Sequence, residues 1–171
     1  TGKSTVFNRL TGLRQHTGNW PGKTVTLATG GFRWKGKSFT VVDLPGTYSL
    51  YANSPDEEVA RDFLCFGSPS VSIVVVDATC LERNLNLVLQ VIEMTPNVVV
   101  CLNLVDEARR QNLRIDAGSL RDELGVPVVP CAARQGEGIC ELKDAVFGVA
   151  TGQMQTSPRP PVYGEAIERR I

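Results

Sequence analysis

The sequence predicts an α/β fold with a mostly parallel sheet, one antiparallel hairpin strand, and helices on both faces. Apolar runs of strand length recur along the chain, which is typical of strands covered on both faces of a sheet. Segments with helical periodicity alternate with these runs, and parallel strands need crossover connections that are usually helices. The buried strands are expected at residues 71–77, 97–102 and 126–130, the last with prolines that suit a strand near an edge.

Five segments before, between and after these strands are expected to be helical. The first begins at Lys3, places its apolar residues on one face, and ends at Gly12. Gly125 is a second good stop signal, because glycine readily adopts the backbone conformation that ends a helix. The other four helices are expected at residues 57–65, 81–94, 117–124 and 139–151.

The antiparallel hairpin is expected in the first third of the chain. Its strands span residues 24–34 and 38–43, and Lys35-Gly36-Lys37 joins them as a turn. The stretch from Gln15 to Lys23 shows no periodicity and is rich in turn residues, so we expect an exposed, mobile loop there.

The composition indicates one globular domain and argues against several functional classes. A chain of 171 residues with 18 acidic and 18 basic residues has no net charge, and no basic block indicates nucleic-acid binding. The five cysteines are scattered without a C-x-x-C pair, which favours free, mostly buried thiols over disulfides or a zinc site. No apolar run approaches the ~18 residues that span a bilayer, and no signal peptide precedes the first motif. Any membrane part is therefore expected outside these residues.

The first polar motif, Gly2-Lys3-Ser4-Thr5, matches the second half of a phosphate-binding G-x-x-x-x-G-K-[ST] loop. In such a loop backbone N–H groups surround a polyphosphate, the lysine reaches the β- and γ-phosphates, and the Ser4 hydroxyl binds Mg²⁺. The first half of the motif and its preceding strand are expected upstream of Thr1. That first strand lies in the middle of the sheet, so without it we expect a gap between the strands ending at Asp43 and Asp77.

The second motif, Asp43-Leu44-Pro45-Gly46, follows an apolar strand pattern. In this position Asp43 can orient a Mg²⁺-bound water, and the Gly46 N–H can donate to a γ-phosphate only while that phosphate is present. Loss of that contact would release the loop that follows. Thr24, just before a strand, is the preferred candidate for a second Mg²⁺-binding hydroxyl, and Thr17 is the alternative.

Two later motifs favour guanine. Asp106, in Asn103-Leu104-Val105-Asp106, can accept hydrogen bonds from both the N1–H and the exocyclic amine, a pair that adenine does not offer. Leu104 replaces the usual lysine, so a stacking contact with the base is lost. In Ala132-Ala133-Arg134 the Ala133 N–H is expected to meet guanine O6, with Ala132 where serine is commoner. The ordered motifs predict a P-loop GTPase that binds GTP rather than ATP.

The sequence indicates least clearly which residues assist hydrolysis. Many GTPases place a glutamine directly after D-x-x-G to position the attacking water, and Thr47 stands there instead. We therefore expect slow hydrolysis unless a cation or a partner supplies charge, and we assign His16 to the solvent rather than to catalysis. The nucleotide-binding residues are expected to be Gly2, Lys3, Ser4, Thr5, Gly22, Lys23, Thr24, Asp43, Gly46, Asn103, Leu104, Asp106, Ala132, Ala133 and Arg134, with Lys3, Thr24 and Gly46 acting in catalysis and Ser4, Thr24 and Asp43 binding Mg²⁺.

Three longer strings carry a resemblance to a family: Asn19-Trp20-Pro21-Gly22, Asp43-Leu44-Pro45-Gly46-Thr47-Tyr48-Ser49-Leu50 and Leu81-Glu82-Arg83-Asn84-Leu85. They closely resemble the N-terminal G domain of the bacterial ferrous-iron transporter FeoB family. The resemblance implies a cytosolic domain that hydrolyses GTP slowly and is accelerated by K⁺, with the K⁺-coordinating Asn just before Thr1. It also implies a helical domain next, then a membrane-embedded iron pathway of the same polypeptide in the inner membrane.

On this basis we expect a GTPase domain at residues 1–151, a linker at 152–162 and the start of a helical domain at 163–171. The switch segments are expected at residues 15–25 and 44–60. No cluster in the sequence resembles an Fe²⁺ site, so the iron connection rests on the resemblance, and whether the domain forms a homo-oligomer is left open. The alternatives are a ribosome-assembly or RNA-modification GTPase, and a nucleotide-gated interaction module whose hydrolysis is incidental.

Overall fold

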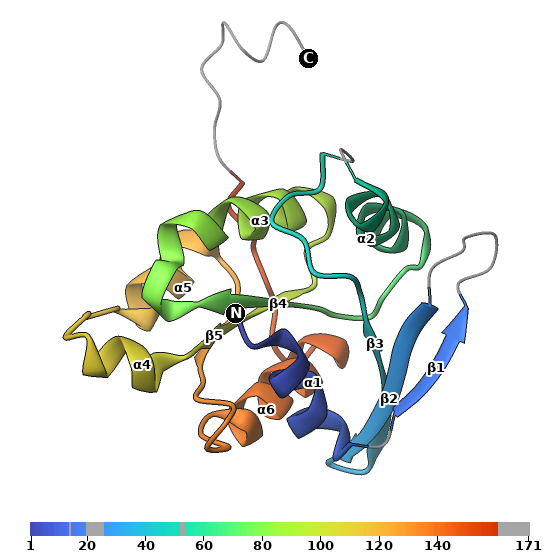
Figure 1. Cartoon of the computed structure of the whole chain (residues 1–171), viewed down its shortest axis with the longest axis horizontal. Helices are drawn as coiled ribbons and strands as arrows, with labels where there is room; N and C mark the ends of the chain where they lie inside the picture. Colours follow the sequence, from blue (N-terminus) through green and yellow to red (C-terminus); the bar gives the residue numbers. More distant parts are fainter. Residues whose placement is uncertain (14, 20–25, 52–53, 161–171) are drawn as a thin grey trace, which may run out of the picture.

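Helices cover both faces of a three-stranded parallel sheet, and a three-stranded antiparallel sheet lies beside it at one edge of the molecule (Figure 1). The computed structural model describes residues 1–13, 15–19, 26–51 and 54–160. The antiparallel sheet contains β1 (Gln15–Asn19), β2 (Thr26–Trp34) and β3 (Lys37–Asp43), and the parallel sheet contains β4 (Ser72–Asp77), β5 (Val98–Asn103) and β6 (Val128–Pro130), each in that order. The helices are α1 (Lys3–Thr11), α2 (Pro55–Phe66), the 3₁₀ turn η1 (Ala78–Cys80), α3 (Leu81–Met94), α4 (Val105–Arg110), α5 (Ala117–Leu124) and α6 (Ile139–Ala150).

Strand β5 shows why the apolar runs lack alternation. All six of its residues are buried. Val98, Val100 and Leu102 pack into one hydrophobic core with residues of α3 and α5. Val99 and Cys101 point the other way, into a second core with α1 and α6. The predicted α/β fold with helices on both faces is therefore confirmed.

The hairpin between β2 and β3 is also confirmed, and its turn follows from two residues. Trp34 pairs with Lys37, so Lys35 and Gly36 form a two-residue turn with φ of 46° and 79°. Positive φ at both positions is the type I′ geometry, whose twist matches that of the flanking strands. Asp144 of α6 holds this turn, because it accepts a hydrogen bond from Trp34 Nε1 at 2.8 Å and pairs with Lys35 Nζ at 2.7 Å.

The expectation of a loop from Gln15 is wrong for residues 15–19, which form strand β1. This strand pairs antiparallel with β2, from Gln15 opposite Gly30 to Asn19 opposite Thr26. Backbone hydrogen bonds to β2 can hold an edge strand without an apolar face, so a search for hydrophobic alternation misses it. Residues 20–23 of the expected loop lie outside the described residues.

The helices lie close to the predicted positions, but the predicted first residues are less accurate. Helix α2 begins at Pro55, two residues before the expected start, because the Ser54 hydroxyl accepts a hydrogen bond from Glu57 N at 3.3 Å and proline suits the first turn. Helix α4 was not expected at all. Its six residues, with only Val105 and Ala108 buried, are too few to show an apolar repeat.

The free cysteines depart in part from expectation. No disulfide links the described cysteines, but only Cys101 and Cys131 are buried, whereas Cys65, Cys80 and Cys140 are exposed. The expectation of mostly buried thiols is therefore wrong. The Cys131 thiol and burial raise the pKa of the Cys101 thiol well above its usual value, so Cys101 stays protonated as part of the core.

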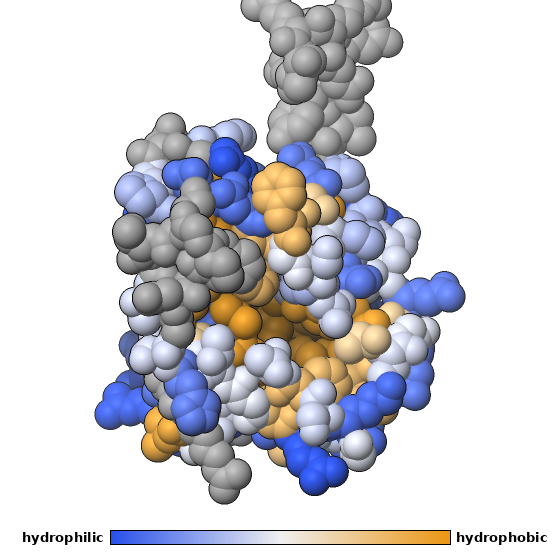
Figure 2. Space-filling view, turned by 90° about the vertical axis from the view of Figure 1, so that its right-hand side faces the viewer, coloured by the Kyte–Doolittle hydropathy of each residue, from blue (hydrophilic) through white to orange (hydrophobic). Residues whose placement is uncertain are grey.

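A gap separates β3 from β4, as the sequence predicts. The two strands belong to different sheets, and a cleft of about 690 Å³ lies between them. Phe39 and Val41 line one wall, and Ile73 and Val75 line the other. The space-filling view shows a hollow with hydrophobic walls on this side of the molecule (Figure 2).

The first part of the expected linker is attached to the domain. Residues 152–160 contain no helix or strand, but Ser157 N donates to Gly125 O at 2.9 Å and Arg159 N donates to Leu124 O at 3.0 Å. Gly125 ends α5 with φ of 69°, and a Cβ on it would lie 1.8 Å from Ser157 O. Glycine is thus required here both for the helix end and for the approach of this segment. Residues 161–171, including the expected helical start, lie outside the described residues.

Candidate nucleotide-binding site

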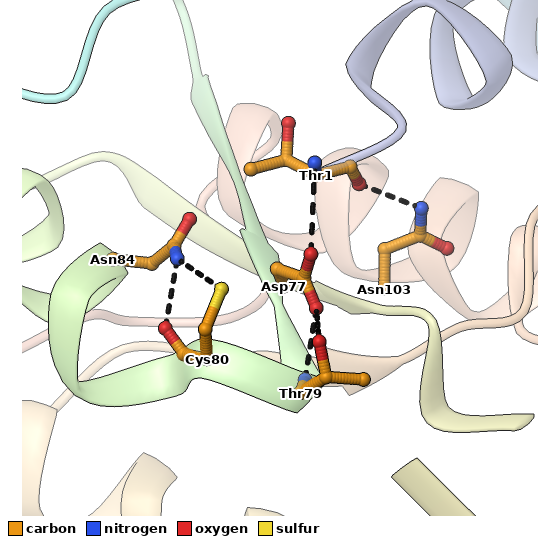
Figure 3. Close-up of polar contacts among 6 residues, drawn as sticks. All are labelled: Thr1, Asp77, Thr79, Cys80, Asn84 and Asn103. Atoms are coloured by element: carbon orange, nitrogen blue, oxygen red, sulfur yellow. Dashed lines mark hydrogen bonds and ion pairs between the residues drawn. The ribbon is translucent and has the colours of Figure 1, made fainter. Parts of the chain in front are cut away.

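The predicted motifs meet at one edge of the molecule, where the carboxyl ends of the strands lie. Asp43 ends β3, Asp77 ends β4, Asn103 ends β5, and Ala132 follows β6. Helix α1 begins at the same edge, since Thr1 contacts both Asp77 and Asn103 (Figure 3). In α/β proteins this edge is where ligands bind, so the fold brings the four motifs into one site.

Lys3 joins the phosphate-loop motif to the D-x-x-G motif. Its Nζ forms an ion pair with the Asp43 carboxylate and donates to Leu44 O at 2.8 Å. Both side chains are partly exposed, at 34% for Lys3 and 19% for Asp43. A cation and a carboxylate in contact at a helix N-terminus are the groups that a phosphate–Mg²⁺ complex requires.

Asn103 connects three segments of the site and is almost fully buried. Its Nδ2 donates to Thr1 O at 2.9 Å, and its Oδ1 accepts from Ala133 N at 3.0 Å. Gly2 adopts φ of 72°, and a Cβ there would lie 2.6 Å from Asn103 Nδ2, so only glycine fits. Asn103 thus positions the loops, and a guanine O6 would share or replace its contact with the Ala133 N–H.

Asp106 lies in the first turn of α4, close to these loops. Its Oδ2 accepts a hydrogen bond from Gln135 Nε2 at 2.8 Å and lies 3.5 Å from an Arg110 guanidinium nitrogen. Its Oδ1 is buried and has no hydrogen-bond partner. A carboxylate oxygen without a donor is costly when buried, and the paired N–H groups of guanine would satisfy it.

Two further residues belong to the site, and sequence patterns did not reveal them. Arg9 of α1 donates from Nε to Ala133 O at 2.9 Å and from a terminal nitrogen to Arg134 O, which fixes the last motif against α1. Asp77 accepts from Thr79 N at 2.8 Å and Thr79 Oγ1 at 2.6 Å (Figure 3). Burial acts to raise the pKa of Asp77, but the two Thr79 hydrogen bonds, the positive charge at Thr1 and a Cys80 hydrogen bond together hold the pKa below its usual value.

The other predicted residues differ in exposure, and three of them lie outside the described residues. Ser4, Thr5, Gly46 and Arg134 are exposed, Leu104 is half-buried, and Ala132 is buried with its N–H bonded to Glu137 O at 3.1 Å. Leu104 has φ of 64°, which lets the chain turn from β5 into α4. Gly22, Lys23 and Thr24 lie outside the described residues, as does the Trp20–Pro21 part of the same string.

Thr47, which replaces the usual glutamine, is engaged within its own turn. Its hydroxyl donates to Ser49 O and accepts from Ser49 N at 3.1 Å. Leu50, which follows Ser49, is anchored separately, because its N–H donates to Gln90 Oε1 of α3 at 2.7 Å. With its hydroxyl committed to the backbone, Thr47 is poorly placed to orient an attacking water.

Ser4 and Asp43 are chemically suited to bind Mg²⁺. Both offer the hard oxygen ligands that this ion prefers, and Mg²⁺ in nucleotide sites usually keeps several waters and few protein ligands. Asp43 is paired with Lys3 in this structure, and phosphate oxygens would draw the lysine away from it. Among the described residues no group of three or more His, Cys, Asp or Glu side chains could hold a metal ion.

The sequence model of ferrous iron transport protein B matches residues 1–146. The chain belongs to this family. It is 46% identical over 150 residues to the Fe(2+) transporter FeoB of Salmonella typhimurium, covering 85% of this chain and 19% of that protein. The cytosolic domain of the T. maritima FeoB iron transporter is similar in its GDP form II (TM-score 0.92, 39% identity) and in its GMPPNP form (TM-score 0.91, 40% identity). Each comparison covers 98% of this chain and 66% of the other.

Membership in the FeoB family agrees with the fold and with the order of the motifs. The chain has the P-loop GTPase fold of the FeoB cytosolic domains, and it spans about a fifth of the length of the curated FeoB relatives that it matches. Within the described part of the chain, no helix has the length and apolar character needed to cross a membrane.

Proposed function

We propose that this chain binds GTP and hydrolyses it slowly as the regulatory domain of a membrane Fe²⁺ transporter, on the cytoplasmic side of the bacterial inner membrane. The observation that carries the proposal is that the Lys3–Asp43 ion pair, which suits a phosphate–Mg²⁺ complex, and the Asp106 carboxylate, which suits guanine, lie at one sheet edge. A site with only one of these halves would not distinguish GTP from other anions or other nucleotides.

Each half of the site has a distinct task in nucleotide binding. Lys3 leaves Asp43 to contact the β- and γ-phosphates, while Ser4, Asp43 and Thr24 hold Mg²⁺. Asp106 accepts the two N–H donors of guanine, and the Ala133 N–H donates to guanine O6. The GDP and GMPPNP forms of the T. maritima relative support guanine nucleotides as the ligands.

Slow hydrolysis follows from the groups around the γ-phosphate. The Gly46 N–H contacts that phosphate and Lys3 neutralises charge that develops during the transfer to water. Thr47 adds nothing to the attacking water because its hydroxyl is bonded to Ser49. K⁺ bound next to the phosphate loop would balance the remaining transition-state charge.

The nucleotide state is proposed to act on a transporter region of the same polypeptide. The segments at residues 15–25 and 44–60 respond to the γ-phosphate, and residues 1–151 form the GTPase domain, with a helical domain beginning at 163–171. The name of the Salmonella relative, Fe(2+) transporter FeoB, supports iron as the transported ion. No nucleic-acid partner is proposed, given the balanced charge and the absence of a basic block.

Single-turnover hydrolysis with GTP or ATP, each in K⁺ and in Na⁺, tests this proposal. We expect product only from GTP, formed about tenfold faster in K⁺, which corresponds to ~1.4 kcal/mol of transition-state stabilisation. Equal rates in the two salts would remove K⁺ from the mechanism and weaken the transporter assignment. GTP binding without any hydrolysis would instead favour an interaction module.

A further inference from the structure

The Gln135 side chain is hydrogen-bonded to the Asp106 carboxylate, with which guanine would pair. Its Nε2 donates to Asp106 Oδ2 at 2.8 Å, and Gln135 itself is exposed. Neither residue type nor spacing singled out Gln135 in the sequence. The contact joins α4 to the loop at residues 132–138, which carries the Ala133 N–H of the same site.

The carboxamide of Gln135 resembles guanine in the way it meets Asp106. Both present an N–H donor on a flat, conjugated group, so both satisfy the same carboxylate oxygen. The second oxygen, Oδ1, is buried and unbonded in this arrangement. Guanine needs both oxygens together, so Gln135 must leave Asp106 before the base can pair with it.

The loop is held at both ends, and Gln135 lies between the two attachments. Arg9 fixes the near end through Ala133 O and Arg134 O. Arg109 fixes the far end through a two-pronged ion pair with Glu137, at 2.7 and 3.2 Å. Because the loop is held at both ends, Gln135 can leave Asp106 Oδ2 by rotation of its own exposed side chain, which is fast, without movement of the loop.

We propose that Gln135 is a gate on the guanine-binding carboxylate: it competes with the base for Asp106 and lowers the rate of nucleotide entry. This inference rests on the proposed function, because it requires that Asp106 bind guanine. The observed affinity equals the intrinsic affinity scaled by the fraction of molecules in which Gln135 is turned away. Dissociation is not gated, since Gln135 has already left Asp106 in the bound state.

Stopped-flow binding of a fluorescent GDP to the protein and to three variants tests the gate. Gln135→Ala should raise the association rate constant roughly three- to tenfold, because no side chain competes for Asp106. Gln135→Lys should lower it by a similar factor, because an ammonium group forms a stronger, charge-assisted bond to the carboxylate. Gln111→Ala, at an exposed glutamine that ends α4, is the matched control and should leave the rate constant unchanged.

The pattern of rates separates this inference from the proposed function. Dissociation rate constants within twofold of the parent in both Gln135 variants are expected, together with unchanged melting temperatures. Association rates that do not move in opposite directions for alanine and lysine, in a parent that binds GDP, would overturn the gate alone. A parent that does not bind GDP would overturn the proposed function and the gate with it.

Discussion

The affinity of an Asp106→Asn variant for GTP should fall by a factor of about 100 or more, and the variant should bind xanthosine triphosphate instead. Guanine directs two donors at the carboxylate, the N1–H and the exocyclic amine. Asparagine offers one acceptor and one donor, so its amide N–H₂ would face one of the two guanine donors. Xanthine carries a carbonyl oxygen in place of the amine, and this oxygen accepts from that N–H₂. Titration of both triphosphates in the presence of Mg²⁺ measures this change in nucleotide preference.

The control for this change is Asp122→Asn on α5. Asp122 is 68% exposed and pairs only with the neighbouring Arg121 in the described contacts, so its loss removes one negative charge without touching the site. It should leave both affinities within twofold of the parent. If Asp106→Asn also kept its preference for GTP, Asp106 would not be the residue that reads the base.

A Lys3→Ala variant should weaken binding of both GTP and GDP, by roughly 100-fold for GTP, since hydrogen bonds to charged groups contribute about 1.5–3 kcal/mol each. Lys3 is the cation at the start of α1 that we propose contacts the phosphates, and in this structure it bridges Asp43 and Leu44 O. Arginine should not restore binding, because its planar fork is larger and meets phosphate differently from an ammonium. Equilibrium titration of the three proteins measures the effect.

Lys37→Ala provides the matched control, because Lys37 is an exposed lysine at the opposite end of β3 from Asp43. Its removal should change affinity by less than twofold. Lys3 would have no role in phosphate binding if its alanine variant kept GTP affinity within threefold of the parent. Thermal unfolding of the variant, recorded beside titration, distinguishes a lost contact from a lost fold.

Much of the fold was predictable because the buried strands carry their signal locally. Val98–Asn103 is apolar throughout, and Gly125 and Gly12 mark helix ends by their backbone freedom. Strand β1 was not predictable in this way, because its polar residues pair through the backbone with β2, and the partner is not visible in the pattern.

The motifs predict residues that the structure brings together at one sheet edge, such as Lys3, Asp43 and Asn103, but not what these residues contact. Asn103 was expected to recognise guanine, and it also holds Thr1 and Ala133 together. Arg9 and Gln135 contact residues 124 and 29 positions away, respectively, through side chains at no characteristic spacing. Such contacts depend on how separate elements pack, which periodicity within one element does not contain.

Competitive binding of GTP and ATP to the purified protein in Mg²⁺ and K⁺ tests the central claim most directly. The claim is that a phosphate half built on Lys3 and Asp43 and a guanine half built on Asp106 form one site. It predicts saturable binding of GTP, displacement by GDP, and no displacement by ATP at 100-fold excess. Equal displacement by ATP would contradict the claim, because it would show phosphate binding without recognition of the base.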